Sequence, residues 1–596
     1  MDSPVFLMGT IAVAVLIFYI VLKILSKSRD TRWELEHIDG NKSIVVLVHG
    51  LSGRKKFEST IQLAKATLPN SDLLVFDYDS RILSNEDPYE IANVVERQIH
   101  EAYLKHKYSE IVLVGYSMGG MLTRKALLWG NGFEEDRKKS GLRGKREWVE
   151  KVSRYVSLAA INRGWSISPR PGNMTSGTYL QFRFGDWVAR FTSTGKLLRA
   201  FKRGSPFISD ARVQWIFFCR DSKNTYNVPQ TIHLLGDNDD IVNKDDSMDL
   251  GVAKNTIFVT LLQTGHRQIG TALNGGTLQA DKDRREKVTL AIAGQIEELD
   301  ADETVPFIED LSTTKIVYVV HGIRDYGDWT DQIRTAIMQK ALVNNLSLRV
   351  VNLKYGRFPM LPFLLYWDRQ KNVRLFMDEY TENMARFPNA RVFDFIGHSN
   401  GTYILASALK RYKTPCADKV FFAGSVVPKH YTWRALADDG RVKHVANVVA
   451  SGDWVVAIFP RFLEQIADWK GVQPSDGFLD IGSAGFRGFQ DSMDGQGRIE
   501  NIQFAKGSHG TGIDVANIKK LDAIVGYIVY NDKTGFSIFK NDNMPVAWLD
   551  FFSNISWFVW ILLLGLLLGL GLLFFSLSFW IGCVYIALII ALVNSV

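Results

Sequence analysis

Residues 111–129 of this 596-residue chain read IVLVGYSMGGMLTRKALLW. The stretch begins as a β-branched apolar run, typical of a buried parallel strand, and ends with the pattern of a helix. Between the two, Gly115-Tyr116-Ser117-Met118-Gly119 predicts a sharp strand-to-helix turn that holds a serine hydroxyl exposed at the end of the strand. We therefore expect an α/β fold in which Ser117 is a nucleophile.

Further strand patterns lie on both sides of this turn. Residues 43–49 (SIVVLVH), 73–77 and 155–159 are apolar runs of strand length, and helical patterns separate them. Alternation of strands and helices predicts a mostly parallel sheet that is covered by helices on both faces.

The serine turn, together with His49-Gly50-Leu51 after the first strand, resembles lipase-like serine esterases of the α/β-hydrolase superfamily, which include thioesterases and lipid deacylases. The resemblance covers most of residues 43–270. It implies hydrolysis of an ester or thioester and leaves the substrate open.

The resemblance also implies the partners of the serine. A serine hydroxyl needs a histidine to take its proton, and the histidine needs a carboxylate that fixes its tautomer. Within the GDNDDIV turn the family pattern selects Asp239, with Asp237 and Asp240 as alternatives, and His266 lies beyond the next strand. The backbone amides of Leu51 and Met118 are the expected oxyanion donors.

The same pattern restarts after an acidic linker at residues 300–313, so a first domain at 41–299 is followed by a second at 314–531. KIVYVV (315–320) leads into a second His-Gly turn, and GHSNG carries Ser399. Asp453 and His509 follow the later strands. By the same resemblance these residues form a second triad, with the amides of Ile323 and Asn400 as oxyanion donors.

Two apolar segments of the domains suggest lipid contact. Residues 161–212 occupy the position of a lid and mix aromatic with basic side chains, which suits an acyl substrate with an anionic head or an ordinary capping subdomain. Residues 355–366 are apolar with two prolines, which favours domain packing over a loop that dips into a membrane or lines an acyl tunnel.

Both ends of the chain are apolar. Residues 4–26 are long enough for a membrane anchor, which we favour over a cleaved signal peptide, and residues 555–594 for a transmembrane hairpin. Lys27 and the basic residues after it predict that both domains face the cytoplasm.

Composition excludes several other functions. The net charge of +7 is spread without a basic stripe, so nucleic-acid binding is not expected. The three cysteines lie far apart, and no metal or cofactor is predicted. We expect a membrane-anchored serine hydrolase with the lipid bilayer and an acyl ester or thioester as partners. The alternative is that one or both domains act as a non-catalytic binding or scaffold module.

Overall fold

A computed structural model describes residues 19–24, 26–27, 29–51, 53–134, 144–166, 174–220, 225–242, 246, 252, 255–270, 277–302, 308–323, 327–471, 477–493 and 497–595. The chain divides into two compact units, Met1–Ile308 and Glu309–Val596. Each unit is described by itself.

The first unit is built on a seven-stranded sheet in the order β1-β3-β2-β4-β5-β6-β7. All neighbours pair in parallel except β1, which is antiparallel to β3. The strands are β1 (Arg32–Glu36), β2 (Ser43–Val48), β3 (Ser71–Asp77), β4 (Glu110–Tyr116), β5 (Val152–Leu158), β6 (Gln230–Gly236) and β7 (Thr256–Leu261). The class is α/β, as the alternating pattern predicts.

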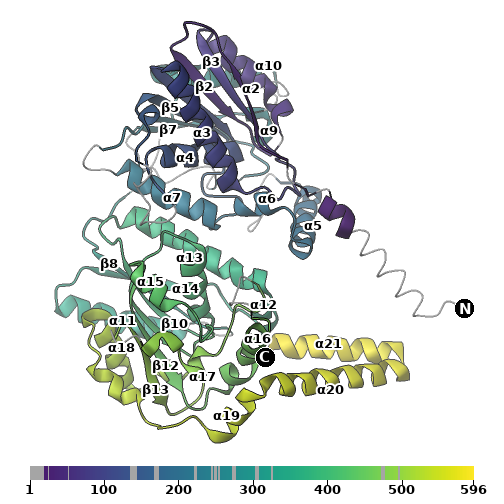
Figure 1. Cartoon of the computed structure of the whole chain (residues 1–596), viewed down its shortest axis with the longest axis vertical. Coiled ribbons are helices and arrows are strands. Elements are labelled where there is room, and N and C mark those ends of the chain that lie inside the picture. The colour runs from purple at the N-terminus through teal and green to yellow at the C-terminus, as the bar shows by residue number, and fades with distance from the viewer. Residues whose placement is uncertain are drawn as a thin grey trace, which may run out of the picture. The chain divides into compact units, whose positions relative to one another are not determined.

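Helices cover both faces of this sheet (Figure 1). Alternate residues of β2 enter different cores: Val46 packs with α3, α4 and α7, whereas Val45 packs with α2 and α10. The helices are α2 (Arg54–Thr67), α3 (Pro88–His106), α4 (Met118–Gly130), α5 (Ser176–Thr192), α6 (Lys196–Ala200), α7 (Pro206–Cys219), α9 (His266–Gly270) and α10 (Leu278–Ala293). A strand buried on both faces explains the unbroken apolar run.

The second unit repeats this design with six parallel strands in the order β13-β12-β11-β10-β8-β9. On one face, Phe376 of α13 packs against Tyr318 and Phe395. On the other face, Ile333 and Ile524 come from α11 and α18. The strands are β8 (Lys315–Val320), β9 (Leu348–Leu353), β10 (Phe393–His398), β11 (Ala417–Ala423), β12 (Val442–Ala450) and β13 (Ile499–Ala505).

The helices of the second unit follow the strands in the order expected for a parallel sheet. They are α11 (Asp328–Val343), α12 (Met360–Leu364), α13 (Tyr366–Arg386), α14 (Asn400–Arg411), α15 (Trp433–Asp438), α16 (Trp454–Trp469), α17 (Ala484–Arg487), α18 (Ile518–Tyr530) and α19 (Ala547–Asn554).

The C-terminal apolar stretch folds as two packed helices, α20 (Ser556–Leu577) and α21 (Phe579–Ser595) (Figure 1). Tyr585 donates a 2.8 Å hydrogen bond to the carbonyl oxygen of Leu567 and joins them. In the described part of the chain, α20 alone has the length and apolar composition to cross a membrane, and α21 is shorter. The predicted anchor at residues 4–26 lies mostly outside the described residues.

Candidate active site

In the first unit, Ser117 stands at the end of β4 as the N-cap of α4, with φ 55° and ψ −120°. Such a backbone is strained for a residue with a side chain. Both glycines of the turn are required because a side chain at either position would overlap the neighbouring backbone. A Cβ atom on Gly119 would lie 2.2 Å from the carbonyl oxygen of Val48, and one on Gly115 would lie 2.5 Å from Cα of Gly120.

A continuous chain of hydrogen bonds starts at this serine. Nε2 of His266 lies 3.0 Å from Oγ of Ser117, and Nδ1 of His266 lies 2.8 Å from Oδ2 of Asp239. The other oxygen of Asp239 accepts from the amides of Ile241 and Val242 at 2.9 and 2.8 Å. These bonds hold the carboxylate in place, so the imidazole is oriented from both sides.

The two alternative aspartates, Asp237 and Asp240, form no hydrogen bond with His266 among the described residues. Asp237 accepts hydrogen bonds of 2.9 Å from the amides of Gln263 and Thr264, and thereby ties the loops after β6 and β7 together. Asp240 acts on His266 only as a nearby negative charge. The structure therefore brings Asp239, and neither alternative, to the histidine.

The environment favours a basic imidazole. Burial by itself lowers the pKa of His266, but the negative charge of Asp239 and its hydrogen bond outweigh that effect, so the pKa lies above the usual value. Tyr116, the residue before the serine, donates a 3.1 Å hydrogen bond to the carbonyl oxygen of His266 and fixes its backbone. The sequence did not single out this tyrosine.

The loop after β2 is fastened by a second tyrosine. Tyr78 donates to the carbonyl oxygen of His49 and stacks on its ring, with centroids 4.3 Å apart. Nδ1 of His49 bonds the carbonyl oxygen of Gly50, which supports a structural role for His49. Leu51 follows in this loop. The amide of Met118 belongs to the first turn of α4, where N–H groups have no intrahelical acceptor.

The second unit repeats the serine turn. Ser399 is the N-cap of α14 with φ 52° and ψ −118°. A Cβ atom on Gly401 would lie 2.3 Å from the carbonyl oxygen of Val320. Ile323 follows the His-Gly turn after β8, and Asn400 begins α14.

The second triad is joined on one side only. Nδ1 of His509 lies 2.9 and 3.1 Å from the two carboxylate oxygens of Asp453. Burial lowers the pKa of His509, but the charge and the hydrogen bond of Asp453 outweigh burial and raise it above the usual value. Across the described residues, however, no hydrogen bond joins His509 to Ser399. His398 donates a 3.3 Å hydrogen bond to the carbonyl oxygen of His509, as Tyr116 does in the first unit.

In the second unit, too, a tyrosine holds the loop that contains a predicted oxyanion donor. Tyr355 donates to the carbonyl oxygens of His321 and Gly322 at 2.6 and 3.0 Å, and it accepts a 3.1 Å hydrogen bond from Nδ2 of Asn400. Its segment continues into α12, so the apolar stretch at residues 355–366 contains a site residue and a short helix.

The predicted lid corresponds to α5, α6 and α7. Part of its basic character is neutralised, because Asp186 forms ion pairs with Lys202 and Arg190. Apolar side chains of α5 face solvent instead, with Phe184 64% and Trp187 55% exposed. Arg190 and Lys202 are thus already paired within the predicted lid, and whether the lid binds an acyl substrate with an anionic head stays a prediction.

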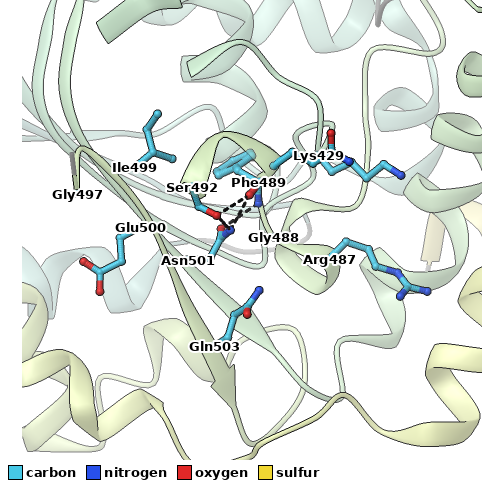
Figure 2. Close-up of a pocket in the computed structure, with 11 residues that line it drawn as sticks. Lys429, Arg487, Gly488, Phe489, Ser492, Gly497, Ile499, Glu500, Asn501 and Gln503 are labelled. Atoms are coloured by element: carbon cyan, nitrogen blue, oxygen red, sulfur yellow. Dashed lines mark hydrogen bonds between the residues drawn. The ribbon is translucent and has the colours of Figure 1, made fainter. Parts of the chain in front are cut away.

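A cavity of about 460 Å³ in the second unit is separate from the triad residues (Figure 2). Its lining includes Lys429, Arg487 and Asn501 (Figure 2). Within the described ranges, no group of three or more His, Cys, Asp or Glu side chains is placed to hold a metal ion.

Comparison with known proteins gives one family match, in which residues 42–184 fit the model of "Lipase (class 2)". No curated protein matches the chain. The matched segment contains Ser117 but ends before Asp239 and His266.

Several solved structures are similar over somewhat less than half of the chain. A monoacylglycerol lipase from Paleococcus ferrophilus is 13% identical over 44% of this chain and 99% of its own, with a TM-score of 0.29. An esterase from Exiguobacterium antarcticum is 14% identical over 45% and 96%, with a TM-score of 0.28. Carboxyl esterase 2 from Tuber melanosporum is 15% identical over 45% and 83%, with a TM-score of 0.29. The first unit is an α/β domain by its own strand order, and residues 42–184 within it are similar to the class 2 lipase model.

Proposed function

We propose that this chain is a membrane-tethered serine hydrolase that cleaves an ester or thioester through an acyl-enzyme on Ser117. The observation that carries the proposal is the hydrogen-bonded chain from Ser117 through His266 to Asp239. The class 2 lipase match around the serine supports the same chemistry.

The geometry supports a two-step reaction. Oγ of Ser117 attacks the substrate carbonyl while Nε2 of His266 takes its proton, and Asp239 stabilises the resulting imidazolium. In this mechanism the amides of Leu51 and Met118 bind the oxyanion, as the serine turn and the His-Gly turn predict. Collapse breaks the bond to the alcohol or thiol, which leaves with the proton from His266. Water then attacks the acyl-enzyme by the same route and releases the acid.

The second unit has two candidate functions. The strained Ser399 and the bonded pair of His509 and Asp453 support a second hydrolase site, which becomes active when His509 moves onto the serine. The missing bond between His509 and Ser399 favours the alternative of a binding or scaffold module. Hydrogen bonds of this kind often tighten only when substrate is bound, so the first function remains our proposal.

The tether is proposed from the apolar ends. The hairpin of α20 and α21 supports insertion into a membrane. A hydrolase held there would act on a lipid or a lipidated ester within reach of the bilayer. The cytoplasmic orientation of both units rests on the basic residues from Lys27 onward.

Labelling with a fluorophosphonate probe tests the proposal on the full chain in membranes. Wild type, Ser117→Ala, Ser399→Ala and the double variant are compared for covalent labelling. We expect strong labelling that Ser117→Ala removes in large part and slower labelling at Ser399. Wild-type protein that folds but takes up no probe would refute a serine hydrolase. Labelling that Ser117→Ala abolishes completely and Ser399→Ala leaves unchanged would leave the second unit as a binding module.

A further inference from the structure

The helix α16 buries the polar side chains of Glu464 and Gln465 and exposes a tryptophan at each of its ends. Glu464 is 1% exposed and accepts hydrogen bonds from the amide of Lys429 and the hydroxyl of Ser483 at 2.7 and 2.5 Å. Trp454 and Trp469, at the two ends of the helix, are 58% and 64% exposed. Large exposed aromatic side chains at both ends of one helix are suited to an apolar or interfacial surrounding.

This helix lies across the base of the C-terminal hairpin. Trp469 packs edge-on against Trp557, with ring centroids 5.4 Å apart. Phe459 lies 5.2 Å from the ring of Trp560, and the hydroxyl of Ser556 donates a 2.7 Å hydrogen bond to Gln465. These contacts span most of α16 but only the start of α20, which places α16 at the level where the hairpin leaves the unit.

The rest of the hairpin matches a bilayer. Beyond Trp560, α20 continues to Leu577, and at 1.5 Å per residue this part is about 26 Å long, close to the roughly 30 Å of a hydrocarbon core. If it is inserted, α16 lies at the headgroup level. The short helix α19 before the hairpin has Trp548 and Phe551 each 59% exposed, which extends the same surface. Tryptophan and phenylalanine are favoured at this depth.

The second candidate site is attached to this surface from two directions. Asp453 is the N-cap of α16, accepts a 3.1 Å hydrogen bond from the amide of Val456, and bonds His509. On the other side, the segment of Tyr355 leads into α12, which contacts α21. The helix α16 and the segment from Tyr355 to α12 therefore connect the second candidate site to the hairpin.

We propose that the exposed faces of α16 and α19 dock on the lipid bilayer and that the second site acts on the acyl ester of a bilayer lipid. The ester carbonyls of glycerolipids lie directly below the headgroups, and therefore next to the level that α16 would occupy. The proposal of a lipid substrate rests on the proposed hydrolase function of the second unit. In that function Ser399, His509 and Asp453 take the roles that Ser117, His266 and Asp239 have in the first unit. The docking on the bilayer does not rest on that function.

A depth measurement tests the docking. Nitroxide labels are placed at Trp454→Cys and Trp469→Cys in the full chain without its native cysteines, reconstituted in vesicles of phosphatidylcholine and phosphatidylglycerol. We expect the labels to collide more with oxygen, which concentrates in lipid, than with a water-soluble nickel complex. The control is Leu342→Cys, which is 79% exposed and should show the reverse. Leu342 belongs to α11, a helix on the opposite side of the second unit from the hairpin (Figure 1). Tryptophan positions that behave like Leu342→Cys overturn the docking.

A labelling experiment tests the substrate class. In a Ser117→Ala background, Ser399 is labelled with a short soluble fluorophosphonate or with a long-chain one embedded in vesicles. For Trp469→Glu we expect the ratio of long-chain to short-probe labelling to fall about tenfold, because a charge at this depth weakens membrane contact. Leu342→Glu should leave the ratio unchanged.

The outcomes separate the proposals. An unchanged ratio for Trp469→Glu, or no labelling of Ser399 by either probe, overturns the lipid substrate of the second site. The absence of any labelling at Ser117 in wild type would instead refute the proposed hydrolase function. The nitroxide result still decides whether the second unit docks on the bilayer.

Discussion

The hydroxyl of Tyr78 donates a 2.7 Å hydrogen bond to the carbonyl oxygen of His49. His49 directly precedes the Gly50-Leu51 turn, so this bond fixes the backbone on which an oxyanion donor depends. Tyr355 does the same for His321 in the second unit. The two units thus share a positioning residue that follows a neighbouring strand and never touches the serine's hydrogen-bond chain.

Replacing Tyr78 by Phe should loosen this loop without removing a triad residue. Loss of one hydrogen bond worth about 1 kcal/mol corresponds to roughly fivefold in rate. We expect kcat on a p-nitrophenyl ester to fall by about that factor, with KM little changed. Tyr355→Phe is the matched control and should leave turnover at Ser117 unaltered; an equal loss from both variants would contradict a local role.

Asp239→Asn should lower kcat by about four orders of magnitude, because the imidazole loses its orientation and its counter-charge. Turnover needs neutral His266, so activity falls as the pH drops through the pKa of this histidine, which Asp239 raises. Without that carboxylate the pKa falls, and the acidic limb of kcat/KM should move to lower pH. Asp240→Asn should retain turnover. A loss in Asp240→Asn as large as that in Asp239→Asn would contradict the assignment of Asp239 as the partner of His266.

Gly119→Ala should prevent correct folding of the first unit. The new Cβ would lie 2.2 Å from the carbonyl oxygen of Val48, and overpacking against backbone costs more than about 2 kcal/mol. Gly177 on α5 has no heavy atom within 4 Å of such a Cβ. Gly177→Ala should therefore be neutral or stabilising by up to about 1 kcal/mol. The thermal midpoint of Ser117 labelling measures both, and equal midpoints would contradict the steric argument.

Glu86 predicts a pH dependence of stability. Burial, and then the negative charge of Asp79, raise its pKa from 4.5 to about 7. The folded state therefore holds this proton more tightly than the unfolded state, and stability falls as the pH rises from about 4.5 to 7, by up to about 3 kcal/mol.

Glu86→Gln should remove that loss, so that the variant is more stable than wild type at pH 8 and equal to it near pH 4. Heat inactivation of Ser117 labelling at the two pH values measures the effect. Exposed Glu90→Gln serves as the control. A wild type and a Glu86→Gln variant with the same pH profile would show that Glu86 is ionised without penalty.

The strands and the serine turns were predictable because they depend on local patterns. The run KIVYVV (315–320) coincides with β8. The strand β1 was missed, because RWELE alternates like an exposed edge strand and lies before the predicted start of the domain at residue 41. The residues Tyr116 and His398 carry no motif of their own, and their role appears only when a strand end meets the histidine loop.

Other features of the site depend on distances that no motif specifies. Three aspartates in one turn were compatible with the pattern, and the loop contacts of Asp237 and Asp239 separate them. The missing bond between His509 and Ser399 likewise reflects the exact placement of two loops. The exposed aromatic surface around Trp469 could not be predicted either, because it depends on how the hairpin packs against α16.

The positive φ angles of Ser117 and Ser399 have an evolutionary consequence. Backbone strain of this kind costs about 1–3 kcal/mol, and glycine would relieve it. In a site whose hydroxyl was no longer used, mutation to glycine would be stabilising and free of selection against it. Ser117 and Ser399 are therefore positions at which stability would favour loss of the hydroxyl whenever the chemistry did not require it.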